Sequence, residues 1–75
     1  MEQLMEVLKK AASKVDWTLE GNLIEEGILD SVDIISVVAE LTAEYGIEIP
    51  AEEMEVENFC NAQAIYDMVQ RLLEE

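Results

Sequence analysis

The sequence contains no histidine, a single cysteine and a single proline among its 75 residues. Without histidine, neither a Ser-His-Asp nor a Cys-His catalytic arrangement can form within the chain. The single cysteine, Cys60, excludes an internal disulfide and a cysteine-based zinc cluster. A chain this short also has too small a core to enclose a deep catalytic cleft. We therefore expect one domain over residues 1–75, and we expect that it is not an enzyme.

Long apolar stretches are also missing. No run of residues without a charge approaches the roughly 20 residues that a membrane-spanning helix needs. The N-terminal Met1-Glu2-Gln3 lacks the basic and then apolar start of a signal peptide. The sequence therefore predicts no membrane span and a cytoplasmic location.

Basic residues are scarce, with 4 Lys and Arg against 18 Asp and Glu and a net charge of −14. Lys9, Lys10 and Lys14 lie near the N-terminus, and no basic residue occurs between Val15 and Gln70. That interval holds all but four of the 18 acidic residues. Such a field repels nucleic acid and attracts basic protein surfaces. The alternative is that the acidity only keeps a small apolar domain in solution.

Two segments have the apolar spacing of an amphipathic helix. The first is Gln3 to Val15, and the second follows a cap at Asn61 and extends to Leu73. The apolar stripe of the second consists of Ala62, Ile65, Met68, Val69 and Leu72. Between the helices, Asp16 to Asp30 breaks the periodicity, and connections of that length are usually functional. Its predicted core anchors are Leu23, Ile24, Ile28 and Leu29.

A further helix is predicted from Asp30 to Tyr45. Asp30 is a favourable N-cap residue, Asp33 stands at the capping-box position, and Gly46 is a natural C-terminal cap.

After this helix, Ile47 to Pro50 breaks the helical pattern, and Ala51 to Met54 can form one short helical turn. Asn58 to Cys60 is predicted to be a connector, with Phe59 in the core. The expected fold class is all-α, a small bundle of three main helices plus one short helix.

The central helix has distinct faces at roughly 100° per residue. A polar stripe contains Asp33, Ser36, Glu40 and Glu44, and the apolar residues Val32, Ala39 and Ala43 lie on the flank away from the core. An apolar flank edged by carboxylates is typical of a surface that docks a partner. Coverage of this flank by the first helix or by the long loop is the other interpretation, and periodicity does not separate the two.

Ser31 is predicted at the first position of the central helix. A phosphate attached there would meet unpaired backbone N–H groups and the positive end of the helix dipole. Position alone is weak support, because a serine after an aspartate at a helix start is also ordinary capping chemistry.

The run Gly27-Ile28-Leu29-Asp30-Ser31-Val32-Asp33 resembles the attachment motif of the acyl carrier protein family. Gly46-Ile47-Glu48-Ile49-Pro50 and Asn58-Phe59 with Asn61-Ala62-Gln63-Ala64-Ile65 are similar to later segments of the same family. The resemblance spans essentially the whole chain, and the family fold agrees with the helices predicted above.

The resemblance implies that Ser31 receives a 4′-phosphopantetheine arm from coenzyme A, transferred by a phosphopantetheinyl transferase. The arm would hold acyl, aminoacyl or peptidyl intermediates as thioesters and shuttle them between enzymes. The implied partners are a cargo-loading ligase or acyltransferase and downstream synthase enzymes with basic docking surfaces. A monomer is the expected state for this fold.

By the same resemblance, seven residues match the partner-binding positions of the family: Asp30, Val32, Asp33, Ile35, Ala39, Glu40 and Glu44. Departures from the housekeeping fatty-acid carriers occur at Leu29, Val32 and Ser36. The Gly-Ile-Leu-Asp-Ser form is closer to discrete carriers for aminoacyl, peptidyl or polyketide chemistry, including D-alanyl carriers.

Two other functions compete with this interpretation. A calcium sensor would need alternating acidic ligands, a central glycine and a closing glutamate, and the loop from Asp16 to Asp30 lacks them in register. A non-prosthetic acidic helical adaptor or inhibitor would keep the carrier fold and use only its charged face.

Overall fold

The computed structural model describes residues 2–74 and is all-helical over its regular elements. The elements are α1 (Glu2–Ala11), α2 (Ser31–Tyr45), the 3₁₀ turn η1 (Ala51–Glu53), α3 (Val56–Phe59) and α4 (Ala62–Glu74). The predicted all-α bundle of three main helices is confirmed, and the short part consists of two pieces, η1 and α3. Within residues 2–74, no helix has the length and apolar character to cross a membrane.

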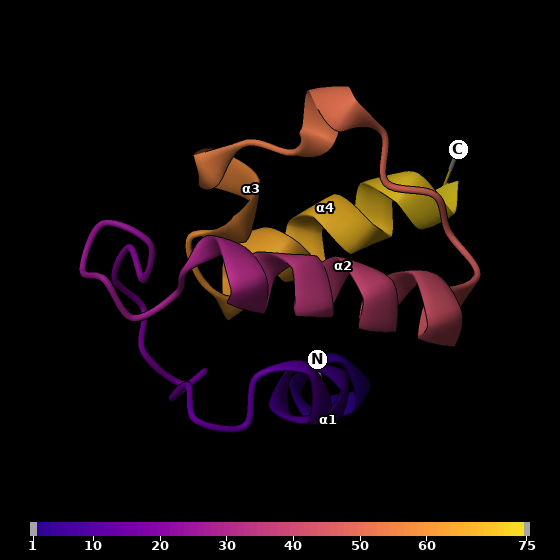
Figure 1. Cartoon of the computed structure of the whole chain (residues 1–75). Helices are drawn as coiled ribbons and strands as arrows, with labels where there is room; N and C mark the ends of the chain where they lie inside the picture. Colours follow the sequence, from indigo (N-terminus) through magenta and orange to yellow (C-terminus); the bar gives the residue numbers. More distant parts are fainter. Residues whose placement is uncertain (1, 75) are drawn as a thin grey trace.

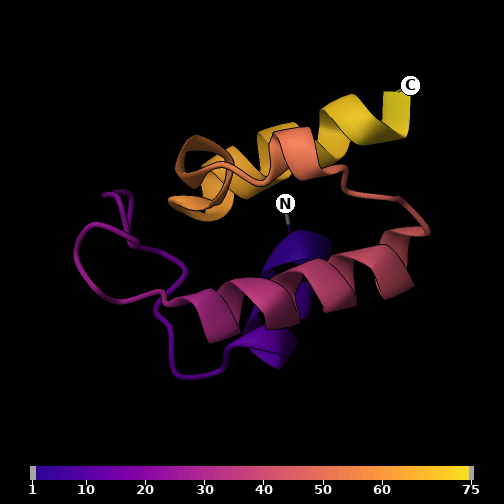
Figure 2. The ribbon, with the colours of Figure 1, turned by 45° about the horizontal axis from the view of Figure 1, so that its top comes forward.

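The three long helices surround one core. α2 and α4 run in the same direction, and α1 crosses them (Figures 1 and 2). α1 contacts both α2 and α4, and α3 packs against α4. The first turn of α2 and α3 lie at the same end of the molecule, although 20 or more residues separate them in the sequence (Figure 1).

The core takes side chains from every long helix. Leu8 of α1, Leu41 of α2 and both Ile65 and Met68 of α4 have no exposed surface. Each such side chain contributes about 1.5–3 kcal/mol relative to an exposed position. The stripe predicted on α4 is confirmed, with its last member, Leu72, only partly buried.

The first helix is shorter than its apolar pattern predicts. It ends at Ala11 rather than Val15, because the backbone turns so that Val15 and Trp17 can both enter the core. The carbonyl oxygen of Ala12 accepts hydrogen bonds from the Val15 N–H at 3.2 Å and from Trp17 Nε1 at 3.2 Å. The Ala12 carbonyl oxygen therefore accepts hydrogen bonds that close a turn, and it does not continue the helix.

The loop between α1 and α2 is hydrogen-bonded to the residues just before α4. Its predicted anchors are confirmed, since Leu23 and Leu29 are buried and Ile24 and Ile28 are partly buried against the core. The Leu23 N–H donates to the Cys60 carbonyl oxygen at 2.7 Å, and Asn61 Nδ2 donates to the Glu20 carbonyl oxygen at 2.8 Å. The loop that precedes α2 is thereby tied to the start of α4.

The segment predicted as a connector before α4 contains helical structure. Phe59 is buried as predicted, but it ends the one-turn helix α3, in which the Asn58 N–H donates to the Glu55 carbonyl oxygen at 3.0 Å. A helical turn shortens the backbone enough to bring Phe59 into the core from an exposed segment. The predicted cap at Asn61 is confirmed, because its Oδ1 accepts the Ala64 N–H at 2.8 Å.

Replacement of Gly46 by alanine tests the C-terminal cap of α2. Gly46 has a φ of 63°, in the left-handed region that disfavours a Cβ. We expect Gly46→Ala to lower the free energy of unfolding by about 1 kcal/mol in urea denaturation.

Gly21→Ala is the matched control, because Gly21 does not have a positive φ and a Cβ there would meet only the flexible carboxylate end of Glu26. An equal loss of stability in both variants would contradict the role of Gly46.

Candidate functional site

The start of α2 is held by a capping box. The Asp33 N–H donates to Asp30 Oδ1 at 2.9 Å, and the Asp30 N–H donates to Asp33 Oδ2 at 3.5 Å. The Asp30 backbone is extended, and its carbonyl oxygen accepts the Ile34 N–H at 3.1 Å. Ser31 is therefore the first residue of α2, and its side chain is exposed.

The Asp30 carboxylate is stabilised in its charged form. The hydrogen bond from the Asp33 N–H is the main cause that lowers the pKa of Asp30; desolvation opposes it, and the positive charge of Lys14 lowers the pKa further. Asp30 is therefore ionised at neutral pH, where it caps the helix.

Asp33 lies inside the bundle rather than on its surface. Only 7% of the residue is exposed, and its Oδ1 lies 3.8 Å from Lys14 Nζ. At roughly 100° per residue, Asp33 is turned about 160° away from Ser31, on the side of α2 that faces the end of α1. The partner-binding role of Asp33 stays a prediction, and its carboxylate is engaged by the cap and by Lys14.

The other acids of the polar stripe remain accessible to different degrees. Glu44 is exposed and lies 3.4 Å from Lys10 Nζ of α1, and Glu40 is partly buried. The spacing of the charges gives no signal for these two pairs, since Lys10 and Lys14 are four residues apart in the sequence and their acidic partners are eleven apart. Contact between the two helices could not be derived from that spacing alone.

An apolar strip is exposed along α2, and we call Val32, Ile35, Ala39 and Ala43 the α2 strip. Val32 and Ile35 are 67% and 66% exposed, and both alanines are exposed. Neither α1 nor the long loop covers these residues. Of the two interpretations that periodicity left open, the exposed flank is therefore the one that the structure has. The strip begins at the residue next to Ser31.

A small apolar hollow lies on the other side of Ser31. It has a volume of about 140 Å³, and its lining consists of Ile24, Ile34, Met54, Glu55, Val56 and Phe59. Ile34 is one helical turn beyond Ser31, so the hollow lies beside the start of α2. Met54 and Val56 line this hollow, and the sequence patterns did not single them out. Their signal is that they are isolated apolar residues in the acidic run from Glu52 to Glu57.

A phosphodiester fits the geometry at Ser31. The hydroxyl is exposed at the positive end of a 15-residue helix, where anions are stabilised. The two neighbouring carboxylates oppose an added negative charge, but Lys14 pairs with Asp33 and the helix N–H groups offset the charge of Asp30. Nothing in the described residues 2–74 groups three His, Cys, Asp or Glu side chains to hold a metal ion.

Comparison with known proteins adds independent information. The family described as "Phosphopantetheine attachment site" matches residues 1–69. D-alanyl carrier proteins from Lactococcus lactis subsp. cremoris and subsp. lactis are 32% identical over 76 residues, which cover 99% of this chain and 96% of the relatives. "D-alanyl carrier protein 2" of Lactiplantibacillus plantarum is 43% identical over 41 residues, which cover 55% of this chain and 51% of that protein.

Substitution of Asp30 tests the cap and its charge. Asp30→Ala removes the acceptor for the Asp33 N–H, and we expect thermal unfolding at pH 7 to shift down by roughly 5 °C. Asp30→Asn keeps a hydrogen-bond acceptor, so its thermal unfolding temperature should fall less.

The pH dependence of the same variants separates charge from hydrogen bonding. Because the folded-state pKa of Asp30 lies below its ordinary value of 3.8, its ionised form stabilises the fold above that pH. The contribution is lost as pH falls through the folded-state pKa. The stability advantage of the wild type over Asp30→Asn should therefore shrink as pH falls below 3.8, and a constant difference would refute the assignment.

Proposed function

Because this chain belongs to the family of proteins with a phosphopantetheine attachment site, we propose that its arm is attached to Ser31. The chain is a non-catalytic carrier protein, and its cofactor is covalently attached 4′-phosphopantetheine. The observation that carries the assignment is the exposed hydroxyl at the first position of α2, next to the α2 strip. Ser13 lies in the turn after α1, and Ser36 is partly buried within α2, so neither shares this setting.

The arm supplies a thiol to which a carboxylic acid cargo can be joined as a thioester. The residues of the chain present the attachment point and leave it accessible. Asp30 holds the first turn of α2, and Ser31 projects from it into solvent. Val37 and Leu41, further along α2, are buried in the core, whereas the Ser31 side chain is exposed. Attachment at Ser31 therefore does not require the bundle to open.

The proposed cargo is an aminoacyl group, with D-alanine as the first candidate. The names of the relatives support it, and so does the Gly27-Ile28-Leu29-Asp30-Ser31 form of the motif. In this proposal a D-alanine-activating ligase loads the arm, in the cytoplasmic location that the sequence favours. Fatty acyl, polyketide and peptidyl cargoes are the alternatives that the loading experiment below compares.

The proposed docking surface for the transferase and the loading enzyme is the α2 strip together with the accessible acids beside it. Asp30, Glu40 and Glu44 lie along the border of the strip, where their negative charges are complementary to basic docking surfaces on partners. Val32 and Ile35 supply the apolar contact at its centre, because large exposed side chains give most contact area.

The intact mass of the protein after incubation with a phosphopantetheinyl transferase and coenzyme A tests the attachment site. We expect the wild type and Ser36→Ala to gain one phosphopantetheine group, and Ser31→Ala to gain none and still fold. An adaptor without a prosthetic group would gain nothing in the wild type. A Ser31→Ala variant that still gains the arm would show that the site lies elsewhere.

The modified protein can then be offered D-alanine, L-alanine and short fatty acids, each with its activating ligase and ATP. The proposal predicts the largest loaded fraction for D-alanine by mass spectrometry.

Replacement of Ile35 by serine tests the docking surface. Because Ile35 is 66% exposed, Ile35→Ser should leave thermal stability nearly unchanged. It should raise the KM of the transferase for this carrier roughly tenfold, which corresponds to the loss of one apolar hot-spot contact. Leu73→Ser is the matched control, since Leu73 is an exposed apolar residue at the far end of α4. Equal KM values for the two variants would contradict docking on the α2 strip.

A further inference from the structure

The segment that follows α2 contributes several lining residues of the hollow beside Ser31, and few of its apolar side chains are buried. We call residues 50–60, which contain η1 and α3, the η1–α3 segment. No residue of η1 is buried, and Met54 and Val56 are exposed. Phe59 at the end of α3 is the buried apolar anchor of this segment. The position of Met54 and Val56 therefore depends on other contacts.

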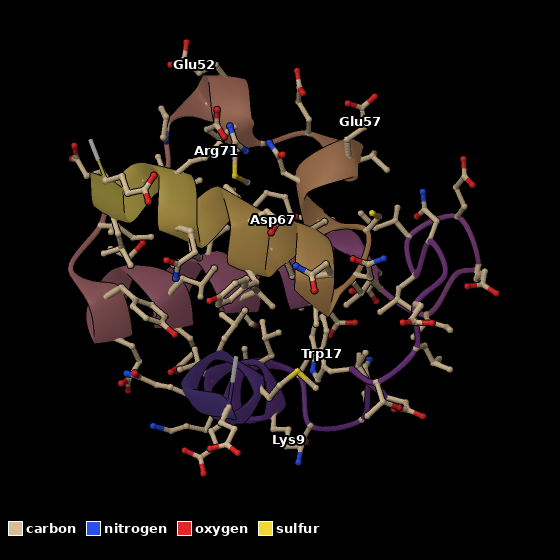
Figure 3. All side chains as sticks on the ribbon, turned by 180° about the vertical axis from the view of Figure 1, so that it is seen from behind. Lys9, Trp17, Glu52, Glu57, Asp67 and Arg71 are labelled. Atoms are coloured by element: carbon tan, nitrogen blue, oxygen red, sulfur yellow. The ribbon has the colours of Figure 1, made fainter. Side chains whose placement is uncertain are left out.

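Those contacts form a polar cluster around Arg71 of α4. Arg71 Nη2 lies 3.0 Å from Glu53 Oε1 of η1 and donates to Asn58 Oδ1 of α3 at 3.2 Å. Asn58 Nδ2 donates to the carbonyl oxygen of Glu53 at 2.8 Å, which closes the cluster. Figure 3 shows Arg71 extending from α4 toward η1. One guanidinium thus joins α4 to both short helical elements.

The burial of Glu53 makes the cluster depend on Arg71. The Glu53 side chain is only 20% exposed, and its Oε1 is buried without an aligned hydrogen bond, so the charge of Arg71 is its compensation. Removal of Arg71 would leave a buried carboxylate oxygen without a partner, which is unfavourable. Rotation of Glu53 into solvent relieves that cost and releases η1 from α4.

Release of η1 would displace the residues next to the attachment serine. Met54 and Val56 lie in sequence between Glu53 and Asn58, the two residues that Arg71 holds. They line the hollow together with Ile34, one turn beyond Ser31. The α2 cap and the core residues of α2 lie outside the cluster, so Ser31 itself keeps its position.

We propose that Arg71 is a positioning residue, which holds Met54 and Val56 beside Ser31 and so sets the affinity of the carrier for the enzyme that attaches the arm. The role rests on the proposed attachment at Ser31. A transferase docked over the start of α2 meets an ordered apolar edge in the wild type. Without Arg71 the edge must be ordered during docking, which weakens binding and leaves the chemical step unchanged.

Steady-state kinetics of arm attachment test this role, with Arg71→Gln and Arg71→Lys as variants. We expect Arg71→Gln to raise the KM of the transferase for the carrier roughly three- to tenfold with kcat unchanged. Arg71→Lys should recover part of the loss, because lysine can pair with Glu53 but lacks the planar fork that also reaches Asn58.

Lys9→Gln is the matched control for charge. It changes the net charge by the same amount, and Lys9 is exposed in the last turn of α1. Its KM should rise less than about twofold. A KM that rises equally in Lys9→Gln and Arg71→Gln would overturn the proposal, because net charge would then explain both.

Amide hydrogen exchange gives a second readout that does not depend on the arm. Exchange in residues 53–58 should accelerate in Arg71→Gln and remain unchanged in α2. If Arg71→Gln does not fold, Glu53→Gln removes the same charge pairing with an isosteric side chain and should raise KM similarly. A normal KM in a folded variant overturns the role of Arg71. A wild type that gains no arm at all would instead overturn the attachment at Ser31 and this role with it.

Discussion

The reciprocal hydrogen bonds between Asp30 and Asp33 determine where α2 begins, and the geometry of the site depends on that point. With the helix start at Ser31, the buried face of Val37 and Leu41 sets the rotation of α2 in the bundle. The serine is then left at the exposed end, with the α2 strip on one side and the hollow on the other. A domain this small cannot enclose a site, and the proposed attachment hydroxyl lies at the exposed start of a rigid helix.

Three of the four basic side chains connect separate elements rather than balance the overall charge. The ion pairs join Lys10 to Glu44, Lys14 to Asp33 and Arg71 to Glu53, and each one links two separate parts of the chain. The Lys10 pair holds the last turn of α1 against α2, the Lys14 pair holds the turn that follows α1 against the start of α2, and the arginine pair holds η1 against α4. Within residues 2–74 the other acids have no ion pair, so the surface keeps a negative field of the kind that attracts basic proteins.

Local patterns in the sequence predicted most of the fold and the position of Ser31. Apolar spacing and capping residues identify α2, α4 and the cap at Asn61, because those signals arise from residues close in sequence. The early end of α1 depends on Trp17 reaching the core, and the helical turn of α3 depends on the burial of Phe59. The burial of Asp33 and the cluster around Arg71 require contacts between distant segments, which periodicity does not contain.

The exposed acids and the pair between Arg71 and Glu53 respond differently to salt. Exposed carboxylates are screened over about 8 Å at physiological ionic strength, so the attraction of a basic partner to the proposed docking surface should fall as salt rises. The pair between Arg71 and Glu53 includes a buried oxygen, and buried pairs are screened much less. In the proposed docking, salt therefore acts mainly on the rate at which partners arrive, whereas the pair that holds Met54 and Val56 is little affected. Association rate and docking geometry would then depend on different charged residues of one small surface.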